Sequence, residues 1–86
     1  MRHARADDLD RIEGLLAQLR KLSGMTEKKR GVFYVKSRSL LHFHEDPDGM
    51  FADFGLGDSF TRYRVTTGAE QKAFLKIVRE RLTHLP

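Results

Sequence analysis

The chain has 86 residues, of which 40% are hydrophobic, 33% charged and 9% aromatic, and its formal net charge is +4. At about 150 residues per domain this length predicts one domain over residues 1–86, and the composition excludes intrinsic disorder and a membrane protein. Cysteine is absent, which excludes disulfides and thiolate metal sites. No apolar stretch is long enough for a signal peptide or a membrane span, so we expect a cytoplasmic protein.

The first predicted element is a helix over residues 7–22. Its apolar residues recur at three- and four-residue spacing, which places them on one stripe of a helix. These residues are Leu9, Ile12, Leu15, Leu16, Leu19 and Leu22. Asp7 or Asp8 can cap the helix at its beginning, and Ser23-Gly24 offers a left-handed end.

Strands are predicted in the middle of the chain, because seven of the eight aromatic residues lie between positions 33 and 63. We expect strands over residues 32–36, 39–44, 50–54 and 60–65. Turns at Ser37-Arg38, at residues 46–49 and at residues 55–58 are short enough for an antiparallel meander.

A second helix is predicted from Thr67 to about residue 84. Thr67 and Glu70 form a capping-box pattern at its beginning. Its expected apolar stripe contains Phe74, Ile77, Val78 and Leu82, joined by Ala73 and Leu85. The predicted fold is therefore an α+β two-layer sandwich of order α-β-β-β-β-α, with both helices on one face of a four-stranded antiparallel sheet.

The turn over residues 46–49 allows two registers. A type I turn with a glycine bulge would pair Phe43 with Asp53 and put the Asp53 carboxylate on the helix-covered face. A four-residue loop would instead pair Phe43 with Ala52 and Leu41 with Phe54. Burying an unpaired carboxylate is costly, which favours the second register. It places four side chains together on the open face: His42, His44, Phe51 and Asp53.

Two histidines and an acid on the open face suggest a metal site. Alternate strand residues His42 and His44 lie about 7 Å apart on the same face, and Asp53 could supply a third ligand from the neighbouring strand. Such a set suits a hydrolytic zinc or a non-haem iron. The alternative, which we favour at this stage, is a hydrogen-bonded histidine pair without metal, so no cofactor is predicted.

Basic residues concentrate in one region, since residues 20–38 contain seven Lys or Arg and only one acidic residue, Glu27. Aromatic residues next to arginines on an open sheet are typical of some RNA-binding surfaces. The candidate nucleic-acid contacts are Lys28, Lys29, Arg30, Tyr34, Lys36, Phe51, Arg62 and Arg64. A solvated loop of charges is the alternative interpretation of this region.

No catalytic residues are predicted, because the chain has no nucleophile elbow around its serines. The leading hypothesis is a small interaction domain without enzymatic activity, which forms a homodimer through the open sheet face or a strand edge. A nucleic-acid-binding protein and a metal-dependent enzyme that uses His42, His44 and Asp53 are the alternatives. We expect no membrane partner.

Three segments carry a family resemblance: residues 31–34 (GVFY), 40–46 (LLHFHED) and 49–53 (GMFAD). Together they resemble small bacterial proteins of about this length, a group with no assigned activity. The leucine-rich first helix before a sheet also resembles YjbR-type proteins, for which DNA binding has been suggested. This chain is shorter than those proteins and lacks a helix between its early strands, so no site residue is carried over.

Overall fold

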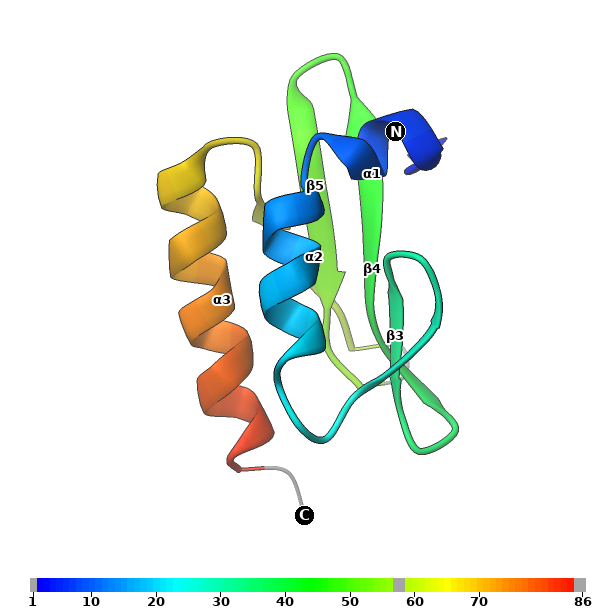
Figure 1. The fold of residues 1–86 in the computed structure, drawn as a ribbon, viewed down its shortest axis with the longest axis vertical. Coiled ribbons are helices and arrows are strands. Elements are labelled where there is room, and N and C mark those ends of the chain that lie inside the picture. Colours follow the sequence, from blue (N-terminus) through cyan, green and yellow to red (C-terminus); the bar gives the residue numbers. More distant parts are fainter. Residues whose placement is uncertain (1, 57–58, 85–86) are drawn as a thin grey trace.

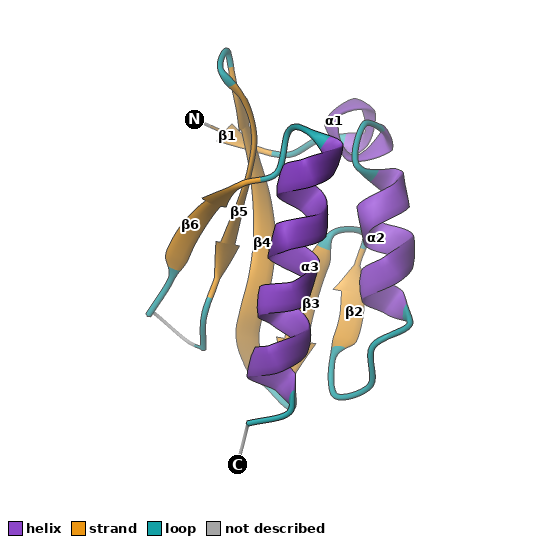
Figure 2. Ribbon diagram, turned by 90° about the vertical axis from the view of Figure 1, so that its left-hand side faces the viewer, coloured by secondary structure: helices purple, strands orange, loops and turns teal. Residues whose placement is uncertain are grey.

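The computed structural model describes residues 2–56 and 59–84, which form a sheet with helices packed on one of its faces (Figures 1 and 2). The elements in chain order are β1 (Arg2–His3), α1 (Ala6–Asp10), α2 (Glu13–Arg20), β2 (Thr26–Lys29), β3 (Val32–Val35), β4 (Arg38–Asp46), β5 (Gly49–Phe54), β6 (Thr61–Arg64) and α3 (Gly68–Leu82). Strands β2 to β6 lie in sequence order, and β1 pairs with β4. All pairs are antiparallel, so the predicted α+β class with an antiparallel sheet is confirmed.

The predicted strand count of four is wrong, because the sheet formed by the described residues has six strands. Strand β1 is only two residues long, too short to show any periodicity. Strand β2 has the sequence TEKK, and this polar segment lacks the apolar alternation of a half-buried strand. The segment before β3 is therefore one arm of a hairpin and not the loop that its composition predicts.

The helix boundaries also differ in part from the prediction. The first helix is interrupted at Arg11–Ile12, which separates α1 from α2. The Asp8 carboxylate accepts a hydrogen bond of 3.0 Å from the Arg5 backbone N–H. At α3 the capping box is confirmed: Thr67 Oγ1 accepts from the Glu70 N–H, and the Glu70 carboxylate accepts from the Thr67 N–H. Helix α3 ends at Leu82, two residues before the predicted end.

The predicted register of the central hairpin is confirmed, because Phe43 pairs with Ala52 and Leu41 with Phe54. The turn is tighter than expected: Asp46 still pairs with Gly49, which leaves only two residues in the turn. The preceding hairpin turns at residues 36–37, one residue earlier than predicted, since Val35 pairs with Arg38.

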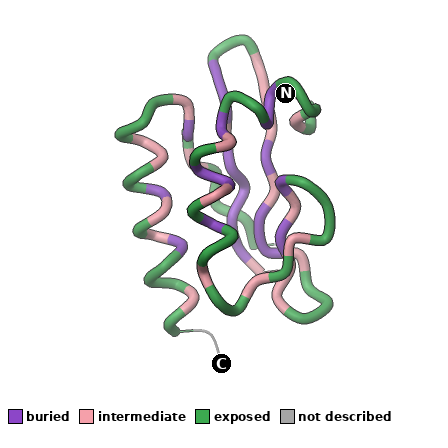
Figure 3. Tube along the Cα trace, viewed as in Figure 1, coloured by how far each residue is buried: buried purple, intermediate pink, exposed green. Residues whose placement is uncertain are grey.

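The core lies between the sheet and the helices, where the buried segments of both layers face each other (Figure 3). Its fully buried large side chains are Phe33, Phe54, Phe74, Ile12, Leu16, Leu19, Leu40, Leu41, Met50, Val65 and Val78. Ala73, which the helical spacing predicts in this core, is exposed instead, while Leu85 lies outside the described residues. No helix in the described part of the chain is long and apolar enough to cross a membrane.

A β-bulge buries two consecutive leucines of β4. Tyr34 pairs with Ser39 and Phe33 with Leu41, so β4 has one extra residue, Leu40, at this point. Leu40 and Leu41 are both 0% exposed. Beyond the bulge, regular alternation returns, and it turns the side chain of His42 to the face opposite the helices.

Candidate metal centre

Strands β4 and β5 bring the three predicted metal ligands together. His42 is the direct cross-strand partner of Asp53, and His44 is two residues further along the same face of β4. One donor atom from each of His42, His44 and Asp53 lies within 4.8 Å of the others. The sheet therefore produces a cluster of two histidines and one carboxylate. The alternation of side chains along β4 and the predicted pairing of β4 with β5 led us to expect this arrangement.

Two of the distances within this cluster are close to the ligand spacing of a metal site. Nε2 of His42 lies 3.4 Å and Nε2 of His44 lies 3.0 Å from the same oxygen, Oδ2 of Asp53. In a tetrahedral zinc site with bonds of about 2.0–2.1 Å, neighbouring ligand atoms are about 3.3 Å apart. The two nitrogen–oxygen distances are thus near this spacing, and all three donor atoms lie within 4.8 Å of one another.

Asp53 is held by a cross-strand arginine. Arg62 of β6 donates from Nε to Oδ1 at 2.7 Å and from Nη2 to Oδ2 at 2.8 Å. The Asp53 residue is 5% exposed, and a carboxylate so placed needs such a partner. These hydrogen bonds lower the pKa of Asp53 and outweigh the opposing effect of burial, so the carboxylate is ionised at neutral pH.

Nε2 of His44 is buried and has no hydrogen-bond partner among the described residues. It lies 3.0 Å from Oδ2 of the Asp53 carboxylate, and the two groups form an ion pair only if the imidazole is protonated. If Nε2 is unprotonated, an electron-rich nitrogen lies 3.0 Å from a negatively charged oxygen. A cation between the two atoms would bind both and remove this conflict.

Both cluster histidines favour the neutral state. Burial lowers the pKa of His42 and of His44, and the attraction of the Asp53 carboxylate only partly offsets this effect. The neutral imidazole is the form that ligates metals, because its nitrogen has a free lone pair.

Two aromatic neighbours of the cluster were missed by the sequence analysis. The His3 ring of β1 lies 4.6 Å from the His44 ring and 5.8 Å from the His42 ring between centroids. Phe60 contacts His42 edge-on at 4.8 Å. A two-residue strand gives no sequence signal for His3, whereas Phe60 belongs to a predicted strand without an assigned role.

The proposed nucleic-acid contacts lie in two groups on either side of β4. Lys28, Lys29, Arg30, Tyr34 and Lys36 belong to β2, β3 and their turns, while Phe51, Arg62 and Arg64 belong to β5 and β6. The Lys28 ammonium lies 4.7 Å from the Tyr34 ring centroid. Lys29 and Lys36 are exposed, and Phe51 is half-buried.

Three of the proposed nucleic-acid contacts form ion pairs within the chain. Arg30 bridges to Asp10 at 2.9 Å and to Glu13 at 2.8 Å. Arg64 bridges to Glu70 at 2.9 Å, and Arg62 is the partner of Asp53. Much of the positive charge that the sequence places on this surface is thus neutralised locally.

No known family model matches the chain, and no curated protein or solved structure is detectably similar to it. The resemblances noted from the sequence therefore stay predictions, and the function is inferred from the geometry of the side chains.

Proposed function

We propose that this chain is a metal-binding domain in which His42, His44 and Asp53 hold one divalent transition-metal ion, such as Zn²⁺. Two observations carry the proposal. One donor atom from each of the three side chains lies within 4.8 Å of the other two, and Nε2 of His44 is buried without a hydrogen-bond partner among the described residues. Two imidazoles and one carboxylate are a donor set that zinc and iron favour over calcium or magnesium.

The site would leave part of the coordination shell of the ion unfilled. Three protein ligands occupy three of the four positions of tetrahedral zinc. The fourth position would take a water molecule or a donor from a bound partner. We assign metal binding to the cluster and assign no reaction to it.

Metal titration tests this proposal. Protein carrying a histidine-free affinity tag is titrated with Zn²⁺ by calorimetry and with Co²⁺, whose visible absorption reports tetrahedral ligation. We expect one ion per chain, and we expect His44→Gln to weaken binding by more than about 100-fold, since even outer contacts of metal sites are worth about 10–100-fold. His84→Gln is the matched control, because His84 is exposed after the end of α3. Equal affinities for the three proteins would refute the site.

Self-association through the same sheet face is a second candidate function. Phe60 is 41% exposed and is the exposed large hydrophobic side chain of the described residues. It lies beside the cluster, two residues before Arg62, whose charge Asp53 compensates within the chain. This compensation reduces the repulsion that two copies would otherwise experience on stacking. We therefore retain the homodimer as a proposal separate from metal binding.

A further inference from the structure

The helix layer contains a groove that the proposed metal centre does not use. Helices α2 and α3 lie side by side and run in the same direction (Figures 1 and 2). Between them lies a mostly apolar groove of about 1140 Å³. We call it the interhelix groove and define it by Gly14, Leu15 and Gln18 of α2 and Ala69, Ala73 and Leu75 of α3.

Glycines in this groove have no packing role within the chain. A Cβ atom added at Gly14 or at Gly68 would meet no other atom within 4 Å. Glycine weakens a helix relative to alanine, so Gly14 lowers the stability of α2 without allowing a closer contact inside the protein. Its missing side chain instead leaves the backbone of α2 open to a molecule in the groove.

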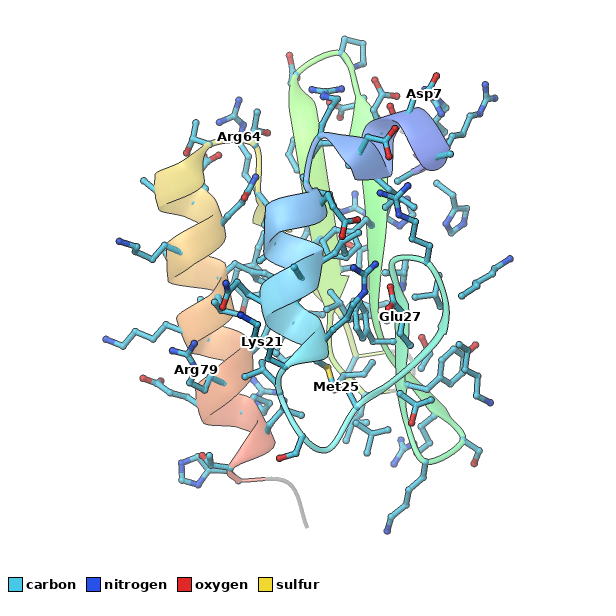
Figure 4. The ribbon with its side chains drawn as sticks, viewed as in Figure 1. Asp7, Lys21, Met25, Glu27, Arg64 and Arg79 are labelled. Atoms are coloured by element: carbon cyan, nitrogen blue, oxygen red, sulfur yellow. The ribbon has the colours of Figure 1, made fainter. Side chains whose placement is uncertain are left out.

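One wall of the groove is positively charged. Lys72, Lys76 and Arg79 are spaced by four and three residues, which places them in one row along α3, and the later turns of α3 carry Arg79 in Figure 4. All three are exposed, and none forms an ion pair with another described residue. None of the described residues that line the groove is acidic.

Two acidic residues next to the groove in sequence are engaged in ion pairs on other sides of the helices. Glu13 bridges to Arg20 and Arg30, and Glu70 bridges to Arg64. Glu80 follows Arg79 on the same helix but does not line the groove and forms no ion pair with the row among the described residues. Inside the groove, a negatively charged molecule would supply the counter-charge that Lys72, Lys76 and Arg79 lack.

We infer that the interhelix groove binds an amphipathic α-helix of a partner protein, with an apolar face toward the groove and acidic residues toward α3. A third helix fits the depression between two aligned helices by the packing of ridges into grooves. Helix α3 has 15 residues and so spans about 22 Å, enough for several turns of a partner. A second copy of this chain fits poorly, because its α3 carries the same cations.

Binding of two designed peptides tests this inference. The probes are a fluorescein-labelled helical peptide of about 15 residues, matched to the length of α3, with leucine on one face and glutamate on the other, and a second peptide with lysine in place of glutamate. Fluorescence anisotropy at about 50 mM salt should show the glutamate peptide binding at least about tenfold tighter, with a preference that shrinks as salt screens the charges. Equal binding of the two peptides, or no binding of the glutamate peptide, would overturn the inference.

Substitutions in the groove locate the binding. Gly14→Ala should raise the melting temperature and keep peptide binding, whereas Gly14→Phe should fill the groove and weaken binding at least about tenfold. Circular dichroism shows whether Gly14→Phe is folded. Independently of that variant, Lys72→Glu/Lys76→Glu should reverse the preference in favour of the lysine peptide. A charge-reversed protein that still prefers the glutamate peptide would refute the groove as the site.

A membrane surface is the competing occupant, and vesicles distinguish it. We expect the protein to bind the glutamate peptide and not vesicles of phosphatidylglycerol, since the groove lies between two helices. If the unmodified protein binds vesicles but no peptide, and Gly14→Phe abolishes this vesicle binding, the occupant of the groove is a lipid surface and not a partner helix. Because the groove and the metal cluster lie on opposite faces of the sheet, either proposal can fail without the other.

Discussion

Arg62 and Asp53 face each other across strands β5 and β6 and are joined by two hydrogen bonds of 2.7 and 2.8 Å. The pair explains how a carboxylate that is 5% exposed is tolerated next to two histidines. It also means that a metal ion at Asp53 would share the carboxylate with a guanidinium. The same arginine therefore stabilises the metal-free protein and opposes the charge of the ion.

Arg62→Gln should separate these two effects. Removing the charged hydrogen bonds should lower the free energy of unfolding without metal by about 1–3 kcal/mol. The affinity for Zn²⁺ should rise, because a positive charge beside the ion is removed. Urea unfolding in a chelator and zinc titration measure the two quantities. A variant that loses both stability and zinc affinity would show that Arg62 positions Asp53 for the metal instead of competing with it.

Phe54→Ala should be strongly destabilising. Phe54 is 2% exposed and packs edge-on against Phe74, with ring centroids 5.8 Å apart. Truncating such a side chain costs about 3–5 kcal/mol in the free energy of unfolding. Phe60→Ala is the matched control, because 41% of Phe60 is exposed, and it should cost less than about 1 kcal/mol. Urea denaturation measures the free energy of unfolding of both variants. Equal losses of this free energy would contradict the burial of Phe54 in the core.

Acid unfolding should depend on Glu70. Hydrogen bonds from the Thr67 backbone and from Arg64 lower its pKa below the ordinary value of 4.5. Its charged form is therefore favoured by folding, so its stabilising contribution is complete above that ordinary value and is lost as pH falls through the lower folded-state pKa. Glu70→Gln should be less stable than the unmodified protein at pH 7, and this difference should close toward about pH 3.

The control for this pH dependence is Glu80→Gln, which removes an exposed carboxylate of the same helix that forms no ion pair among the described residues. Urea midpoints at about pH 7, 5 and 3 give the comparison for the three proteins. A difference between Glu70→Gln and the unmodified protein that persists unchanged at the lowest pH would rule out a role for the Glu70 charge.

The proposed homodimer should depend on the apolar residues beside the cluster. Phe51→Glu and Phe60→Glu each place a charge on that face and should yield a folded monomer, while the unmodified protein sediments as a dimer at micromolar concentration. Ala73 is exposed on α3, in the helix layer away from this face. Ala73→Glu should therefore leave the dimer intact. Sedimentation of the unmodified protein as a monomer would dismiss this candidate.

A nucleic-acid role of the hairpin formed by β2 and β3 predicts a specific salt dependence. Removing one phosphate-binding cation should reduce the slope of log affinity against log salt by about 0.9 on duplex DNA. Lys28→Ala and Lys29→Ala should each show this reduction. Arg30→Ala should not, since Asp10 and Glu13 already neutralise Arg30. If the unmodified protein binds no duplex or single strand at about 50 mM salt, this alternative is eliminated.

The sheet core and the cluster could be predicted because burial leaves a clear pattern in the sequence. Alternation along β4 and β5, with the cost of burying a carboxylate, sufficed to choose the register that unites His42 with Asp53. The structure adds why that choice is correct: Asp53 is buried after all, but on the face where Arg62 can reach it.

The missed elements are those stabilised by polar or very local contacts. Strand β2 has no apolar side chain to mark it, and it is attached through pairs such as Thr26 with Tyr34. The two residues of β1 divide between the faces: Arg2 pairs with Asp8 and Glu45, whereas His3 stacks on the cluster. Such pairings depend on the three-dimensional neighbourhood, so periodicity could not predict them.

The bulge in β4 makes the sheet tolerant of a change in chain length at one point. Deleting Leu40 would leave Ser39 opposite Tyr34 and Leu41 opposite Phe33 in a regular ladder, at the cost of one core leucine and of the hydrogen bond from Gly55 N–H to the Leu40 carbonyl. His42 and everything after it would keep their faces. A single-residue insertion or deletion between Leu41 and His44 would instead move the side chains that follow it in β4 to the opposite face of the sheet.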